Sequence, residues 1–249
     1  MPATPTSTIS PRSAAVHEAA VKALPVDAVL FDLDGTLADT AGDLAGALNR
    51  VRNERGLAPL PVASLRAHAS SGARGLLGAG MGVAPDDAEY PVLREAFLAH
   101  YETCLAETTR LFEGVAELLD ALDARGFAWG IVTNKAARFT VPVVAALNLA
   151  GRAAAVVSGD TTPHPKPHPE PLFHAARALG MPPARCAYVG DDLRDIAAGN
   201  AAGMPTLVAR WGYLGTGEPH DRWPATGGAD HPLGLLDWLP AHGSRAPAD

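Results

Sequence analysis

Short apolar runs recur along this chain, and each is followed by a polar or glycine-rich turn. They cover residues 26–31, 128–132, 154–157, 186–189 and 206–208. Helical patterns of apolar positions occupy residues 115–125, 137–149, 169–179 and 196–202, and a glycine stands at or near the end of each. Glycine just beyond a helix is the usual stop signal. The alternation of strand and helix predicts an α/β fold with a Rossmann-like parallel sheet covered on both faces.

One interval interrupts this alternation. From residue 38 to about residue 110 we find no convincing strand, and amphipathic helices are predicted instead at residues 43–55, 73–81 and 88–106. An all-helical insert that begins at the mouth of a site is well placed to act as a lid. The alternative is a helical bundle that only adds core.

These patterns predict a division of the chain into a core, a cap and two tails. The α/β core comprises residues 25–38 and 111–240, and the α-helical cap comprises residues 39–110. Within the core, residues 212–228 are expected to form a long surface loop, followed by a short helix that closes at Trp238. We expect a mobile amino-terminal tail and a carboxyl-terminal tail, at residues 1–24 and 241–249.

The composition excludes several classes of protein. The chain has 249 residues, of which 47% are hydrophobic, and a formal net charge of −7. That charge argues against nucleic acid or an anionic membrane as the partner, and no apolar run approaches membrane-spanning length. Cys104 and Cys186 lie far apart and in no metal-binding spacing, which favours reduced thiols in a cytoplasmic protein. The first residues also lack the pattern of a secretory signal.

Two carboxylates stand where the first apolar run ends. Asp32 and Asp34 lie two residues apart, and Gly35 and Thr36 then turn the chain. A buried carboxylate is costly unless a cation pairs with it, so this pair predicts a site with a nucleophile and an acid side by side. A calcium loop would need an acidic and glycine spacing that is absent. A pair of turn aspartates would not explain why both follow a buried run.

Three later motifs also follow predicted strands. Thr133 and Asn134 can cradle an anion at a helix start, although such residues also serve as simple caps. Lys166 stands between prolines, which stiffen the backbone and suit a fixed positive charge; the alternative is a solvated lysine on a rigid loop. The last motif holds more acids than the start of one helix needs: Asp191, Asp192 and Asp195.

The four motifs follow successive predicted strands, so a parallel sheet brings them to one edge. Carboxylates crowded there would repel one another and raise one another's pKa. A hard cation with oxygen ligands relieves that repulsion, and Mg²⁺ prefers a few carboxylates together with water and phosphate. The sequence therefore predicts a magnesium site and a phosphate ester as the substrate.

Together the motifs resemble the phosphatases of the haloacid dehalogenase-like superfamily, over roughly residues 26–240. The resemblance implies that Asp32 is the nucleophile and that Asp34 is the general acid and base. It implies that the phosphoryl group and substrate are bound by residues of the second and third motifs: Thr133, Asn134 and Lys166.

The resemblance also implies how the acids hold magnesium. Asp34 contributes its backbone carbonyl, and one of two supporting acids, Asp192 and Asp195, ligates through water. The full set of metal residues is Asp32, Asp34, Asp191, Asp192 and Asp195. The extra amino-terminal tail departs from the common pattern, as do His164 and His168 beside the lysine.

Four further segments, residues 71–74, 129–138, 158–172 and 190–196, are similar to bacterial phosphoglycolate phosphatases. They are also similar to the related branch that dephosphorylates N-acetylmuramic acid 6-phosphate. Both substrates carry a carboxylate, and the candidates to bind it lie at a predicted helix start in the cap: Ser70, Ser71 and Arg74. The alternative for the arginine is a plain surface cation.

We therefore expect a Mg²⁺-dependent phosphatase, with phosphoglycolate as the first candidate substrate and the muramic acid ester as the alternative. A sugar phosphomutase would share every core residue and differ in the cap. A non-catalytic binding module is the third hypothesis. The expected partner is a small phosphate ester, and the chain is expected to be a monomer or a homodimer.

Overall fold

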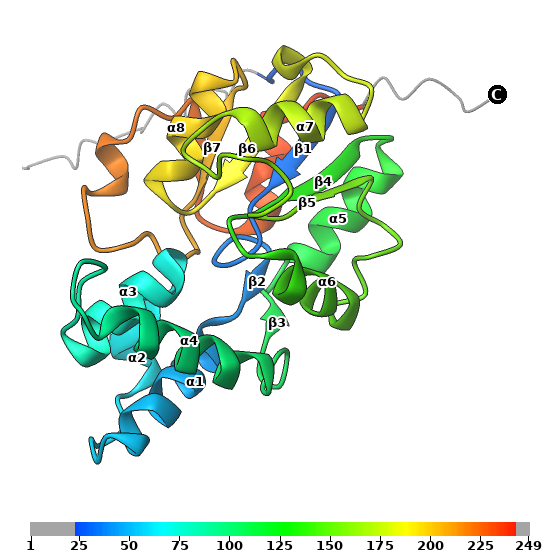
Figure 1. Ribbon diagram of the computed structural model, residues 1–249. Helices are drawn as coiled ribbons and strands as arrows, with labels where there is room; N and C mark the ends of the chain where they lie inside the picture. Colours follow the sequence, from blue (N-terminus) through cyan, green and yellow to red (C-terminus); the bar gives the residue numbers. More distant parts are fainter. Residues whose placement is uncertain (1–22, 243–249) are drawn as a thin grey trace, which may run out of the picture.

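Six parallel strands form the central sheet, in the order β5-β4-β1-β6-β7-β8 (Figure 1). The computed structural model describes residues 23–242. Every neighbouring pair of strands is parallel. The strands are β1 (Ala28–Phe31), β4 (Ala128–Val132), β5 (Ala155–Val157), β6 (Cys186–Gly190), β7 (Thr206–Ala209) and β8 (Gly227–Ala229). The predicted α/β fold with a Rossmann-like parallel sheet is confirmed.

Helices cover both faces of this sheet, which is why its central strands read as unbroken apolar runs. All four side chains of β1 are buried. Val29 and Phe31 pack into the cluster beneath one pair of helices, and Ala28 and Leu30 pack beneath the other pair. The two pairs are α5 (Val115–Ala124) with α6 (Ala137–Ala146), and α7 (Glu170–Ala178) with α8 (Leu193–Ala201).

A separate helical unit lies between β1 and β4 in the chain. It consists of α1 (Ala41–Glu54), α2 (Val62–Leu65), a 3-10 helix (Arg66–Ser71), α3 (Gly72–Met81) and α4 (Tyr90–Glu102). These helices bury their own apolar cluster, which includes Leu48, Leu76 and Phe97. Figure 1 shows the unit beside the core, joined to it by a narrow connection. We refer to it as the cap; its domain boundaries at residues 39 and 110 stay a prediction.

The connection corrects one expectation from the sequence. Between residues 38 and 111 the chain does contain strands, because β2 (Ala38–Asp39) pairs antiparallel with β3 (Arg110–Leu111). Strands of two residues are too short to show an alternation of apolar and polar positions. The ribbon ties the start of the cap to its end, directly after the Asp32 and Asp34 turn.

The expected loop at residues 212–228 is also partly wrong. It contains a 3-10 helix (His220–Arg222), and its last residues begin β8, which extends the sheet beside β7. The sequence of β8 is Gly-Gly-Ala, which has no β-branched residue to signal a strand. A Cβ on Gly227 would overlap the ring of Trp238, so close packing excludes a side chain there. The closing segment, Pro232–Trp238, is a 3-10 helix.

The predicted tails, residues 1–24 and 241–249, fall almost entirely outside the described part of the chain. Within residues 23–242, no helix combines the length and the apolar character needed to cross a bilayer. Both cysteines, Cys104 and Cys186, are buried and free.

Candidate active site

The turn after β1 places two carboxylates at the carboxyl edge of the sheet. Asp32 is 8% exposed, and its backbone N–H donates to the carbonyl of Val189 on β6 over 2.9 Å. Gly35 has a φ of +91°, and a Cβ at this position would overlap the carboxylate of Asp191. Glycine is thus required twice here, for the left-handed backbone and for the close approach of a third acid.

Lys166 is the cation of this site. Its Nζ lies 2.9 Å from Asp32 Oδ1 and 2.7 Å from Asp195 Oδ1, and it donates to Tyr188 Oη over 2.8 Å and to the carbonyl of Val132 over 3.0 Å. Burial lowers the pKa of Lys166, but the two carboxylates more than offset this, so its pKa lies above the ordinary value. The lysine is therefore charged and fixed by four contacts.

Asp191 completes a buried triad of acids with Asp32 and Asp195, in which the nearest carboxylate oxygens all lie within 4.8 Å of one another. Its Oδ1 accepts from Thr36 Oγ1 over 3.0 Å, and its Oδ2 accepts from Ser70 Oγ over 3.0 Å. Burial raises the pKa of Asp191 well above its ordinary value, and the two neighbouring carboxylates raise it further. Burial likewise raises the pKa of Asp32 to about 7, although Lys166 opposes that rise.

The triad fits a hard divalent cation. Asp32 Oδ1 is buried and accepts no hydrogen bond within residues 23–242, although it pairs with the lysine charge. One ammonium cannot neutralise three carboxylates, so the cluster lacks positive charge. Carboxylate oxygens are the ligands that Mg²⁺ prefers. Asp32, Asp191 and Asp195 are therefore the residues that could hold such an ion.

Two of the acids assigned to the metal by resemblance have other side-chain partners. Asp34 Oδ1 accepts from Thr40 Oγ1 over 2.6 Å and from Lys135 Nζ over 2.8 Å. Asp192 caps α8 and binds the guanidinium of Arg194, with Nε 2.8 Å from Oδ1 and Nη2 2.9 Å from Oδ2. Neither carboxylate belongs to the triad. For Asp34, ligation through its backbone carbonyl stays a prediction.

Thr133 and Asn134 follow β4 as expected, but their side chains make different contacts. Thr133 is buried and lines the cavity, and its Oγ1 accepts from the N–H of Lys135 over 3.2 Å. Asn134 donates to the carbonyl of Lys166 over 2.8 Å and accepts from its N–H over 2.9 Å. The amide therefore clamps the lysine loop onto the end of β4, which makes Asn134 a positioning residue by its contacts.

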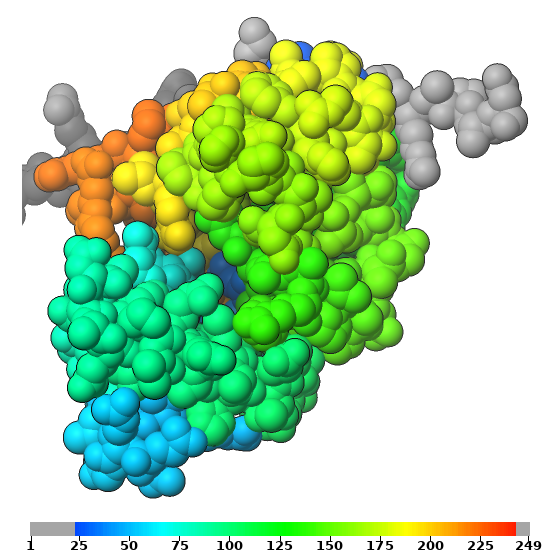
Figure 2. Space-filling view, in the orientation of Figure 1, coloured from blue at the N-terminus to red at the C-terminus, as the bar shows by residue number. Residues whose placement is uncertain are grey.

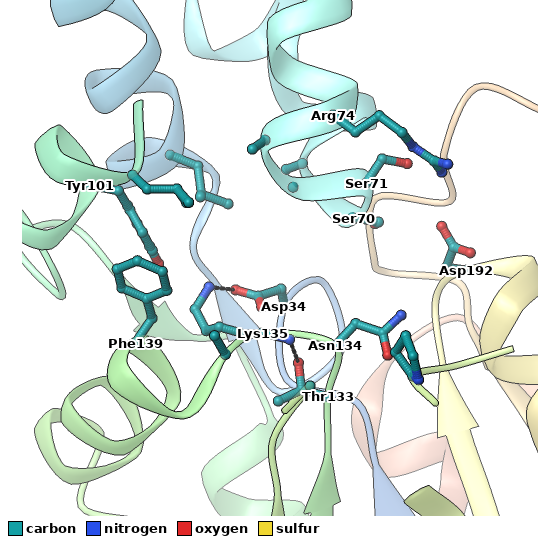
Figure 3. Close-up of a pocket in the computed structure, with 18 of the residues that line it drawn as sticks. Asp34, Ser70, Ser71, Arg74, Tyr101, Thr133, Asn134, Lys135, Phe139 and Asp192 are labelled. Atoms are coloured by element: carbon teal, nitrogen blue, oxygen red, sulfur yellow. Dashed lines mark hydrogen bonds and ion pairs between the residues drawn. The ribbon is translucent and has the colours of Figure 1, made fainter. Parts of the chain in front are cut away.

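The cap contributes Ser70, Ser71 and Arg74 to the same cavity. Figure 3 shows these three on the cap side, across from Asn134 and Asp192. Ser70 is already engaged through its hydrogen bond to the triad. Ser71 and Arg74 also line the cavity, and their roles in substrate binding stay predictions.

Lys135 is the residue that sequence reasoning missed. Its side chain is 7% exposed, it pairs with Asp34, and its Nζ lies 4.8 Å from the ring centroid of Tyr101 on the cap (Figure 3). Burial lowers the pKa of Lys135, and Asp34 more than reverses that effect. One signal was available, because the chain has only three lysines and 17 arginines. Two of those lysines, Lys135 and Lys166, line this cavity.

Comparison with known proteins identifies a family and relatives for this chain. A model of the haloacid dehalogenase-like hydrolase family matches residues 26–203. The chain is 40% identical over 219 residues to the N-acetylmuramic acid 6-phosphate phosphatase of Pseudomonas aeruginosa, covering 88% of this chain and 97% of that protein. It is 42% identical over 215 residues to the phosphoglycolate phosphatase of Xanthomonas campestris pv. campestris, covering 86% and 96%.

A solved structure is similar in fold to this chain. The crystal structure of a predicted phosphoglycolate phosphatase from Haemophilus somnus superposes with a TM-score of 0.74 at 26% identity, covering 85% of this chain and 97% of that one. The chain therefore belongs to the haloacid dehalogenase-like hydrolase family.

Proposed function

We propose that the chain is a Mg²⁺-dependent phosphomonoesterase that works through a phosphorylated Asp32. The family makes it a hydrolase, and relatives named phosphatases support a phosphoric monoester as the substrate. The observation that carries the proposal is the position of Asp32. It is a buried carboxylate that lines a cavity, with Lys166 Nζ 2.9 Å away and two further acids at hand.

The reaction has two steps. A carboxylate oxygen of Asp32 attacks phosphorus, the bond from phosphorus to the leaving oxygen breaks, and Asp34 donates a proton to that oxygen. Water then gives a proton to Asp34 and attacks phosphorus, the bond to Asp32 breaks, and phosphate leaves. Thr40 and Lys135 both contact Oδ1 of Asp34, which leaves Oδ2 for the proton.

Electrostatics must supply most of the rate. Hydrolysis of a phosphate monoester needs acceleration of up to ~10²¹-fold, whereas general acid catalysis supplies about 10²–10⁴-fold. A carboxylate that approaches a phosphate dianion meets like-charge repulsion, and the fixed ammonium of Lys166 opposes it. A Mg²⁺ ion held by the triad would neutralise further negative charge when bound. Asp195 fixes the lysine over 2.7 Å.

The substrate class we propose is a small phosphorylated metabolite that carries a carboxylate. The relatives support phosphoglycolate and N-acetylmuramic acid 6-phosphate alike, at 42% and 40% identity. A cytoplasmic location is part of the same proposal and is supported by two buried, free cysteines. The proposed oligomeric state stays monomer or homodimer.

The test is phosphate release from p-nitrophenyl phosphate by the full chain in Mg²⁺, with Asp32→Asn as the variant. We expect turnover by the wild type, loss of at least about 10³-fold in the variant, and a phosphoryl group on Asp32 detected by mass spectrometry after acid quenching. Near-normal activity of a purified Asp32→Asn protein would refute the nucleophile. Transfer of the phosphoryl group to a sugar instead of water would indicate a phosphomutase.

A further inference from the structure

The cavity that holds Asp32 is larger than the chemistry at its floor requires. It has a volume of about 400 Å³ and extends between α3 and α4 of the cap and α6 of the core. Figure 2 shows the hollow between these segments, with blue atoms from the start of the chain's described part at its floor. The volume corresponds to roughly a dozen water molecules of the liquid. The phosphate ester of a two-carbon acid would leave most of that space unfilled.

The wall of the cavity is mixed in character. An apolar and aromatic side is formed by side chains of the cap and of α6: Tyr90, Phe97, Leu98 and Phe139. Tyr101, also from the cap, is 2% exposed, and its ring centroid lies 4.8 Å from Lys135 Nζ. Apolar and aromatic faces of this kind suit the ring of a sugar.

Three arginines line the same cavity: Arg74, Arg94 and Arg138. All three are exposed, and none forms an ion pair with a carboxylate in the described part of the chain. Among the other described arginines, six form such pairs and six do not. Arg138 is held over the ring of Phe139, with 4.5 Å from its Cζ to the centroid. Positive charge is therefore left unpaired at the cavity of a chain whose net charge is −7.

We infer that Arg94 and Arg138, together with Arg74, form a second anion subsite for a carboxylate on the leaving alcohol. The substrate is then the phosphate ester of a sugar-sized carboxylic acid rather than of a two-carbon acid. The inference rests on the proposed function, because the phosphoryl group must lie at Asp32 for the leaving alcohol to reach this subsite. Arginine suits the role because its planar fork matches a carboxylate.

The test compares two esters that differ in the carboxylate. N-acetylmuramic acid 6-phosphate carries a lactyl carboxylate, and N-acetylglucosamine 6-phosphate has the same ring without it. The measured quantity is the ratio of kcat/KM for the first ester to kcat/KM for the second. We expect Arg94→Gln and Arg138→Gln each to lower this ratio about five-fold, and the double variant to lower it further than either single variant, by less than the product of the two because both side chains share one carboxylate. Arg177→Gln, at an exposed arginine of α7 away from the cavity, is the matched control and should keep the wild-type ratio.

Two further comparisons make the outcome decisive. The wild type should hydrolyse the muramic acid ester with kcat/KM at least about 100-fold above that for phosphoglycolate. A preference for phosphoglycolate, or an unchanged ratio in both arginine variants, would overturn the inference. If the wild type hydrolyses p-nitrophenyl phosphate through Asp32 but neither sugar ester, the inference also fails while the proposed function stands. If no phosphate ester is turned over, the proposed function itself fails.

Discussion

Asparagine in place of Asp32 should stabilise the metal-free protein while it removes activity. The wild-type side chain is 8% exposed and shares its surroundings with two other carboxylates and a single ammonium. Burial raises its pKa from 3.8 to about 7. At about 1.36 kcal/mol per pH unit, that rise corresponds to roughly 4 kcal/mol of free energy. Because the group is almost fully buried, solvent screening reduces this figure little.

The sign follows from proton binding. Between pH 4 and pH 7 the native state keeps a proton on Asp32 that the unfolded chain has lost, so the contribution of Asp32 to the stability of the wild type falls as the pH rises through this window. Asparagine does not titrate. The free energy of unfolding of Asp32→Asn should therefore exceed that of the wild type by an amount that grows with pH and reaches roughly 4 kcal/mol at pH 8. Lys166 does not become unpaired, since Asp195 stays 2.7 Å away.

The assay is urea unfolding in EDTA at pH 5 and pH 8, monitored by circular dichroism. Asp86→Asn, at an exposed aspartate of the cap, is the control and should give the same small difference at both pH values. A difference between Asp32→Asn and wild type that stays constant within about 0.5 kcal/mol from pH 5 to pH 8 would refute the reasoning. Saturating Mg²⁺ should narrow the difference at pH 8, because the cation stabilises the ionised wild-type site.

EDTA is expected to abolish phosphate release, and added Mg²⁺ is expected to restore it. Mg²⁺ should also raise the melting temperature of the protein more at pH 8 than at pH 6, because the carboxylates that bind the ion must first lose their protons. Scanning fluorimetry at both pH values checks this, and an equal gain at both would contradict it. Lys135→Met is expected to lower kcat about 100-fold with an unchanged circular dichroism spectrum, because it removes the ammonium 2.8 Å from Asp34 Oδ1. A kcat within about three-fold of wild type would show that the pair is dispensable. Gly35→Ala is expected to lower the free energy of unfolding by at least about 2 kcal/mol, since its φ is +91° and the new Cβ would overlap Asp191. Urea unfolding measures this, and Gly46→Ala, where nothing lies within 4 Å of the added Cβ, should instead match or exceed wild-type stability.

The sheet was predictable because of how parallel strands are buried. Strands covered on both faces must be apolar at every position, so β1 and β6 stand out in the sequence as unbroken runs. The same reasoning fails for β8, whose sequence is Gly-Gly-Ala and where the ring of Trp238 leaves no room for a side chain at Gly227. It fails also for β2 and β3, where backbone pairing across two residues leaves no pattern.

The positions of the site residues were more predictable from the sequence than the pairings between their side chains. Parallel topology alone brings Asp32, Lys166 and Asp191 to one edge of the sheet. The pairing of Asp34 with Lys135, in contrast, depends on the direction in which a side chain after β4 points. For Asp192 the sequence did hold a signal. An acid followed three residues later by another acid at a helix start is a capping arrangement, and the structure has that capping box.

One contact between the cap and the core involves Asp191, an acid of the buried triad. Ser70 Oγ donates to Asp191 Oδ2 over 3.0 Å, and Arg194 donates to the carbonyl of Ser70 over 2.7 Å. A donor to a carboxylate favours its ionised form, which is also the form that binds a cation. The cap residue Ser70 therefore favours the ionised form of Asp191 through this hydrogen bond, which opposes the rise that burial gives to the pKa of that carboxyl.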